Sequence, residues 1–141
     1  MLSQILDIND RHTLRALKDF QFDWSKKSNP TSIVFSAQVD NEIVGLIEFF
    51  RDKKENYNFL DLIEVVPPYR GSTVAGELLA SVGYDSLEQG FDGFVVFESK
   101  TVIYSYYIKK YGAIPSKGRK LYFDTEATLK LIKTYLGGQN V

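Results

Sequence analysis

The 141-residue chain contains no cysteine and only one histidine, His12. The absence of cysteine excludes disulfides, thiolate nucleophiles, cysteine-ligated zinc and iron–sulfur clusters. A single histidine excludes a multi-histidine metal site, so we expect no bound metal. An enzyme built on this chain must therefore use carboxylates, tyrosines, lysines or backbone groups.

The chain also lacks an excess of either charge and any long apolar run. Seventeen basic residues stand against eighteen acidic ones, for a formal charge of −1. No global positive field attracts nucleic acid or anionic lipid, so phosphate recognition must be local. No run approaches the roughly 18 apolar residues that cross a bilayer, and the N-terminus lacks the apolar core of a signal peptide. We expect a cytoplasmic protein with no nucleic-acid or membrane partner, folded as a single domain over residues 1–141.

The first half of the chain is predicted to be mostly strand. Strands are expected at residues 2–7, 32–39, 42–50 and 59–66. Asp10 can cap a helix over residues 11–22, in which leucines recur at helical spacing. A turn at Asp40 and Asn41 joins the second and third strands into a hairpin.

A helix over 72–88, which Gly90 can end, is followed by a buried strand over 91–98. The order strand, helix, strand predicts a parallel crossover that places 59–66 beside 91–98. The remaining elements are expected to be a helix at 101–111, a hairpin of 113–116 with 120–125, and a helix at 126–136.

The junction between a strand and a helix at residues 60–79 is the most informative segment. It presents unpaired N–H groups and the positive end of a helix dipole at one point. Four side chains of the turn are small enough for close backbone approach by a ligand: Gly71, Ser72, Thr73 and Ala75. This pattern predicts a phosphate-bearing ligand. The alternative is a simple capped helix start with Ser72 or Thr73 as N-cap. The turn lacks the GxxxxGK[ST] and GxGxxG motifs, which disfavours a nucleotide-binding protein.

Three motifs in this order resemble the GCN5-related N-acetyltransferase superfamily, over residues 31–125. The hairpin DNEIVGLIEFF is similar to the second and third strands of that family. SKTVIYSYYIKKYGA resembles its motif of a tyrosine-bearing helix that ends in Lys-x-Gly-Phe. The acetyl-coenzyme A motif is matched by Val65, Pro67 and Arg70, followed by Gly71, Ser72, Thr73, Val74 and Ala75. The family most often has Gly where this chain has Thr73, and a β-branched residue is strained there if the turn requires a positive φ.

The resemblance implies a mixed α/β (α+β) fold with a mostly antiparallel central sheet, helices on both faces and one splayed parallel strand pair. It implies transfer of an acetyl group from acetyl-coenzyme A to a primary amine of a small molecule or peptide by direct attack. Backbone N–H groups around Val65 and Val66 would bind the acetyl carbonyl in the gap, and Lys100 is a further coenzyme contact. The alternative is a degenerate family member that acts as a binding module, an alternative that Thr73 and a displaced tyrosine sustain.

Two catalytic residues are predicted. Glu64 is favoured over Asp61 as the base, because an acid that interrupts LIEVV is hard to place in a core. Its alternative is a catalytically silent carboxylate paired with Arg or Lys. The resemblance also implies a tyrosine of this helix as the proton donor to the leaving thiolate; we choose Tyr107, with Tyr106 as the alternative, although the family's usual spacing falls on Ile108. The tyrosines can instead be packing residues.

The first thirty residues are short for the family, which usually builds much of its acceptor pocket there. An open acceptor site, a pocket completed by a second subunit or a large substrate would follow. The aromatic residues Phe20, Phe22 and Trp24 are candidates either for a homodimer contact or for burial in the core.

Overall fold

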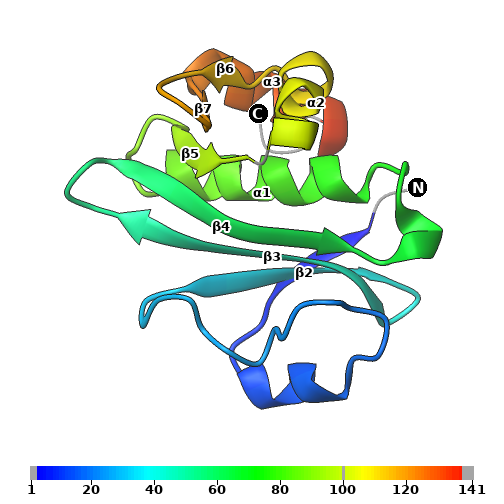
Figure 1. Ribbon diagram of the computed structural model, residues 1–141. Helices are drawn as coiled ribbons and strands as arrows, with labels where there is room; N and C mark the ends of the chain where they lie inside the picture. The colour runs from blue at the N-terminus through cyan, green and yellow to red at the C-terminus, as the bar shows by residue number, and fades with distance from the viewer. Residues whose placement is uncertain (1–2, 100, 138–141) are drawn as a thin grey trace.

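The computed structural model describes residues 3–99 and 101–137, and their strands form one sheet of seven in the order β1-β2-β3-β4-β5-β7-β6 (Figure 1). The strands are β1 (Gln4–Asp7), β2 (Ile33–Val39), β3 (Glu42–Asp52), β4 (Tyr57–Val65), β5 (Val95–Glu98), β6 (Ile114–Pro115) and β7 (Lys120–Phe123). All neighbours are antiparallel except β4 and β5, which are parallel. The predicted mixed, mostly antiparallel sheet is confirmed. Lys100, the predicted coenzyme contact, lies outside the described residues.

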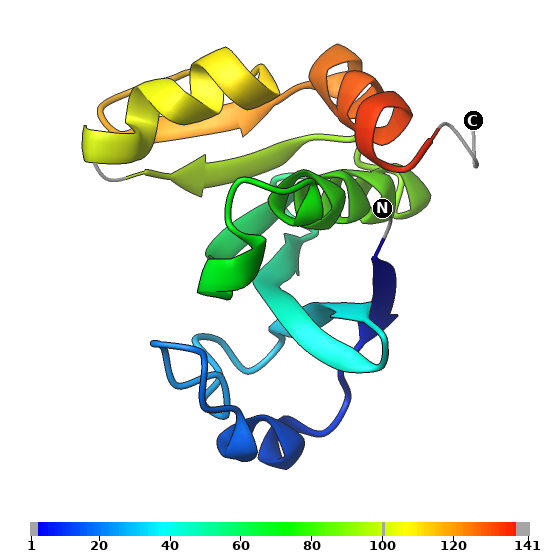
Figure 2. The ribbon, with the colours of Figure 1, turned by 90° about the vertical axis from the view of Figure 1, so that its right-hand side faces the viewer.

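Helices cover both faces of this sheet. They are the α-helices α1 (Val74–Glu88), α2 (Thr101–Tyr111) and α3 (Thr125–Tyr135), and the 3₁₀ helices η1 (Arg11–Ala16) and η2 (Pro67–Tyr69). Helix α1 packs on β2, β3 and β4 and against α3, while the segment that contains η1 lies on the opposite face (Figure 2). Gly76 permits the close approach of α3, because a Cβ there would lie 2.4 Å from the ring of Tyr135.

The hairpin turn between β2 and β3 lies at Asp40 and Asn41, as predicted. Both residues have positive φ, 52° and 67°. Two successive left-handed residues are typical of the primed turns that join tightly paired strands, because the twist of such turns matches that of the strands.

The predicted helix over 11–22 is wrong beyond Ala16. Asp10 does cap the element, since its carboxylate accepts from the N–H of His12 at 2.9 Å. Only the short 3₁₀ helix η1 follows, and the chain is irregular until β2. The N–H groups of Gln21 and Phe22 donate to the Glu64 carboxylate instead of to helical carbonyls. Long-range polar bonds thus override the helical spacing of the leucines.

Strand β4 contains a β-bulge, with one residue more than β3 between two successive paired positions. Leu62 pairs with Glu48 and Leu60 with Phe49, so Asp61 has no partner of its own in the ladder. A bulge of this kind bends the strand and increases its local twist.

Strands β4 and β5 part just before this bulge, after Phe59. They pair only at Asn58 with Val95 and at Phe59 with Val96, although β4 continues to Val65 and β5 to Glu98. The splayed parallel pair that the resemblance implies is therefore present. No helix within the described ranges is long and apolar enough to cross a membrane.

Candidate functional site

A cavity of about 210 Å³ lies where β4 leaves β5, between the end of β4, the following turn and α2; we call it the slot. It brings together most of the predicted site residues: Glu64, Val65, Arg70, Gly71, Ser72, Ala75 and Tyr107. The alternative tyrosine, Tyr106, also lines it. Sequence reasoning missed Ile63, Tyr69 and Tyr111, whose place at the slot depends on how the turn and α2 pack.

The backbone of β4 presents Val65, not Val66, to the slot. The N–H of Val66 donates to the carbonyl of Val44 on β3 at 3.0 Å. Because hydrogen-bonding groups alternate in direction along a strand, the N–H of Val65 points away from β3, toward the diverged β5. The Val66 amide is thus used inside the sheet, and its side chain is buried at 6% exposure. Of the two predicted amide donors, only that of Val65 faces the slot.

The turn after β4 places its one positive φ on glycine. Gly71 has a φ of +82°, a conformation that costs glycine little. Thr73 has a φ of −82° and a ψ of −2°, which a β-branched residue adopts without strain. The departure from the family pattern at Thr73 therefore distorts nothing in this turn, and one of the two reasons for considering a degenerate member is removed.

The start of α1 offers amides that lie outside the helical ladder, near the slot. The first helical bond runs from the N–H of Glu77 to the carbonyl of Thr73, so the amides of Val74, Ala75 and Gly76 precede the helical ladder. The Ser72 hydroxyl accepts from the Val74 N–H at 3.3 Å, a long bond. With small side chains around them, these amides and the dipole of a 15-residue helix suit an anionic group.

Arg70 and Thr73 shape the turn through their side chains. The Nε of Arg70 donates to the carbonyl of Val65 at 3.0 Å, and its own N–H donates to that of Pro67 at 3.2 Å. The hydroxyl of Thr73 donates to the Glu77 carboxylate at 2.5 Å instead of capping the helix. Thr73 and the buried Val74 do not line the slot.

Glu64 is buried at 6% exposure, yet its carboxylate is well satisfied. It accepts from the backbone N–H of Gln21 at 2.6 Å and of Phe22 at 3.2 Å, and from Nε1 of Trp24 at 2.8 Å. The partners are therefore amide and indole donors, not the Arg or Lys considered from the sequence. Trp24 is itself buried at 2% exposure, and only Phe22 among the predicted aromatic residues is exposed, at 48%.

Three tyrosines of α2 form the other wall of the slot. Burial, and then Tyr106, raise the pKa of Tyr107 above the ordinary tyrosine value, and its ring packs edge-on against Phe97 of β5 at 5.0 Å. Burial, and then the proximity of Tyr106, likewise raise the pKa of Tyr111. Both phenols therefore stay protonated at neutral pH. Lys110 lies over the Tyr106 ring at 5.6 Å.

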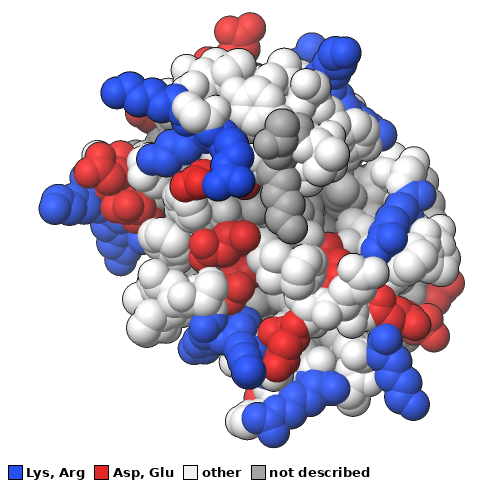
Figure 3. Space-filling model, in the orientation of Figure 1, with Lys and Arg blue, Asp and Glu red and all other residues white. Residues whose placement is uncertain are grey.

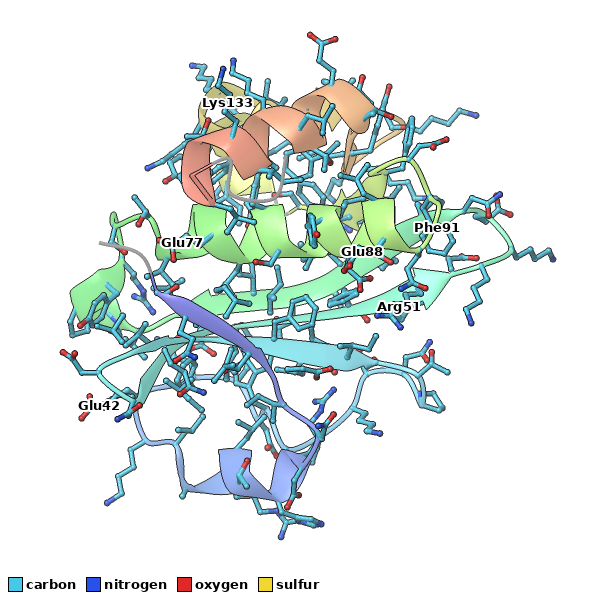
Figure 4. The ribbon with its side chains drawn as sticks, turned by 180° about the vertical axis from the view of Figure 1, so that it is seen from behind. Glu42, Arg51, Glu77, Glu88, Phe91 and Lys133 are labelled. Atoms are coloured by element: carbon cyan, nitrogen blue, oxygen red, sulfur yellow. The ribbon has the colours of Figure 1, made fainter. Side chains whose placement is uncertain are left out.

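A larger cavity of about 390 Å³ lies elsewhere, between α1 and β1. Its lining includes four carboxylates, among them Glu77 and Glu88, which lie along α1 in the rear view (Figure 4). None of the residues that line the slot lines this cavity. On the face drawn in Figure 3, acidic and basic side chains are intermixed, without a large patch of one sign. Among residues 3–99 and 101–137, no cluster of three or more His, Asp or Glu could hold a metal ion.

Solved structures of low sequence identity share this fold. A Bacillus anthracis protein named as a streptothricin acetyltransferase, solved with acetyl coenzyme A, is 20% identical, with a TM-score of 0.54. The match covers 67% of this chain and 62% of that one, so this chain spans less than two thirds of its length. An acetyltransferase of the GNAT family from Staphylococcus aureus Mu50 is 21% identical over 67% of this chain and 68% of its own, with a TM-score of 0.53.

AtaTR bound with AcCoA is 14% identical, with a TM-score of 0.66 over 92% of this chain and 97% of that one. No curated protein matches the sequence. The model of the Acetyltransferase (GNAT) family matches residues 3–108, well over half of the chain. The splayed strands and the amide-rich turn of this protein are consistent with that match. The chain belongs to the GNAT acetyltransferase family.

Proposed function

We propose that this protein transfers the acetyl group of acetyl-coenzyme A to a primary amine of a small molecule or peptide, by direct attack of the amine on the thioester. Family membership supports acetyl transfer, and two structures of similar fold contain acetyl-coenzyme A. The observation that carries the proposal is the parting of β4 and β5 after two paired positions, which leaves a slot bordered by the amide-rich turn.

The turn is proposed to hold the coenzyme's diphosphate. Gly71 to Ala75 have small side chains apart from Val74, which is buried and turned away from the slot. A diphosphate needs several N–H donors within hydrogen-bond reach, and the first turn of α1 supplies them together with its dipole. Arg70 adds a positive charge at the mouth, where it lines the slot. Lys100 remains a predicted contact.

Val65 is proposed to position the reacting group. Its N–H points into the slot, where a carbonyl that gains negative charge during attack can accept a hydrogen bond. An extended amide-bearing chain can also pair with the exposed edge of β4 here, in the manner of an added strand. Both interactions require β5 to be absent from this stretch of β4, as it is after Phe59.

Proton transfer is assigned to two side chains that line the slot. Tyr107 is proposed to donate a proton to the leaving thiolate, because it lines the slot and its phenol is protonated at neutral pH. Glu64 is the carboxylate of the slot, and we assign to it the proton of the acceptor ammonium, taken through a water molecule. Tyr106 is exposed at 48% and is the comparison residue for the tyrosine role.

Thermal unfolding with and without acetyl-coenzyme A tests the binding step. A ligand that binds only the native state raises stability with concentration, so we expect a saturable rise in Tm with acetyl-coenzyme A and with coenzyme A. The transfer step is tested by incubating the protein with acetyl-coenzyme A and a panel of small amines and of peptides with a free amino terminus. Release of the coenzyme A thiol is then measured. A saturable Tm rise without thiol release for any amine would favour a binding module, and no Tm rise at all would refute the proposal.

A further inference from the structure

Tyr135, in the last turn of α3, lies behind the slot and contacts both of its sides. It does not line the slot itself. Its ring packs so closely on Gly76, in the first turn of α1, that a Cβ on Gly76 would overlap three ring carbons. The same ring lies 5.9 Å from the ring of Tyr111, at an angle of 53°. In the rear view, the end of α3 beyond Lys133 lies over the beginning of α1 at Glu77 (Figure 4).

These two contacts reach opposite sides of the slot. Gly76 carries one of the amides that precede the helical ladder, and its neighbour Ala75 lines the slot on the α1 side. Tyr111 lines the slot on the α2 side and is buried at 6% exposure. Because one rigid ring packs against both sides, a change in their separation requires Tyr135 to move.

The preceding turns of α3 fix the position of this ring. Thr128 is fully buried, and its hydroxyl donates to the carbonyl of Gly93, before β5, at 2.6 Å. Leu131 and Ile132 are buried in the core at 3% and 1% exposure. Helix α3 is therefore anchored to the core, and Tyr135 is a fixed support and not a mobile side chain at the surface.

A second glycine of α1 makes the same kind of contact away from the slot. Gly83 lies two turns further along the helix than Gly76, and a Cβ there would lie 2.6 Å from Cγ2 of Thr128 on α3. Neither Gly83 nor Thr128 lines the slot. The interface between the two helices thus contains one close contact linked to the slot and one that is not.

We infer that Tyr135 is a positioning residue for the coenzyme, which holds the amides at the start of α1 and the tyrosines of α2 at the separation that coenzyme A requires. The inference rests on the proposed function and extends it to a residue beyond the matched portion, residues 3–108. Since Tyr135 does not line the slot, it acts through Gly76 and Tyr111. Loss of its ring weakens coenzyme binding although every residue that lines the slot is retained.

Gly76→Ala and Gly83→Ala form a matched pair that tests this role. Each substitution replaces a glycine of the same helix by alanine and pushes a methyl group against α3. At a temperature where circular dichroism shows both variants folded, we expect the Kd of coenzyme A to rise about tenfold in Gly76→Ala and to stay native in Gly83→Ala. An unchanged Kd in Gly76→Ala, or an equal rise in both variants, would overturn the inference.

Substitutions of Tyr135 itself show whether the ring carries the effect. Tyr135→Ala should raise the Kd of coenzyme A as Gly76→Ala does, while Tyr135→Phe, which keeps the ring, should bind like the native protein. Should Tyr135→Ala fail to fold, Tyr135→Leu takes its place. In the double variant Gly76→Ala/Tyr135→Ala the methyl group no longer meets a ring, so the two effects should not add. Full addition would show that Gly76→Ala acts on its own amide and not through Tyr135.

Hydrogen exchange tests the support without any ligand. The first bond of the α1 ladder runs from the N–H of Glu77 to the carbonyl of Thr73 at 2.9 Å. We expect the Glu77 amide to exchange faster in Tyr135→Ala than in the native protein, and at the native rate in Gly83→Ala. An unchanged rate in Tyr135→Ala would overturn the inference. If the native protein does not bind coenzyme A, the proposed function fails, and the exchange rate still decides whether Tyr135 holds the start of α1.

Discussion

The main-chain N–H of Val66 donates to the carbonyl oxygen of Val44 across 3.0 Å. This bond fixes which amides of β4 face the sheet and which face the slot. Since the directions alternate, the Val65 N–H points to the side that β5 has left.

Hydrogen exchange at these two neighbours should therefore differ. We expect the Val66 amide to be protected with or without ligand, and the Val65 amide to gain protection only when acetyl-coenzyme A is added. Residue-resolved exchange measured by NMR checks this. Protection of Val65 in the ligand-free protein, or no change on saturation, would show that its N–H does not face an open slot.

Gly71→Ala should weaken coenzyme binding. The φ of +82° at this position disfavours a residue with a Cβ, at a cost of about 1–2 kcal/mol. Relaxation of this strain shifts the amides of the turn, so we expect a lower Tm and a reduced ligand-induced stabilisation. Both are read in one thermal-shift titration with coenzyme A.

Gly118→Ala is the control for this substitution. Gly118 also has a positive φ, +59°, and a Cβ there meets no atom within 4 Å, as at Gly71. It lies in the turn between β6 and β7, away from the slot. The Tm of this variant should also fall, while the rise in Tm caused by coenzyme A should equal that of the native protein. Equal loss of ligand response in both variants would refute a local role for Gly71.

Tyr107→Phe should slow acetyl transfer and leave coenzyme binding unchanged. The expected fall in kcat is about tenfold to hundredfold, at the low end of general acid effects, because a thiol of pKa about 8.5 leaves without much help. Single-turnover thiol release measures it. Tyr106→Phe serves for comparison, and a larger fall in that variant would transfer the proton-donor role to Tyr106.

Asp61→Asn should stabilise the protein at neutral pH. Burial, with a contribution from Glu48 and against a hydrogen bond from Ser28, raises the pKa of Asp61 above its usual range. The protonated form is then favoured by folding. The contribution of Asp61 to folding stability is complete below the unfolded-state pKa of about 3.9. It is lost as the pH rises through the higher folded-state pKa. Urea unfolding should show a gain for Asp61→Asn at pH 7 that shrinks toward pH 4.

Asp23→Asn should change stability in the direction opposite to Asp61→Asn, and it serves as the comparison in the same urea-unfolding experiment. Hydrogen bonds from Ser25 lower the pKa of Asp23, so the ionised form is favoured by folding. Its contribution is present above the unfolded-state pKa and is lost as the pH falls through the lower folded-state value. The variant should lose stability at pH 7, by an amount that also vanishes in acid. A gain of stability in both variants would show that burial does not set the behaviour of Asp61.

Local signals in the sequence were enough for most of the fold. The strand-like patterns of β2 and β3, the turn at Asp40 and Asn41 and the helical periodicity of α1 are short-range properties, and each of these elements is found where it was expected. Four residues of the turn line the slot for the same reason, because a strand, a turn and a helix that follow one another remain neighbours: Arg70, Gly71, Ser72 and Ala75.

The irregular segment after Ala16 could not be predicted, because residues far along the chain determine it. Its amides bond Glu64, more than forty residues away, and nothing in its own composition shows this. The choice between Val65 and Val66 likewise depends on register with β3 and on the bulge at Asp61. A one-residue uncertainty in register reverses the direction of every amide.

The ring of Tyr135 packs against Gly76 in the first turn of α1. It therefore supports, from the side opposite the slot, the amides at the start of this helix. Helix α3 lies beyond residues 3–108, the portion that defines the family. A shortened version ending at residue 108 would lose Tyr111, which lines the slot, and also the ring of Tyr135, which packs against Gly76. The folded unit that builds the slot is therefore longer than the part of the chain that the family model matches.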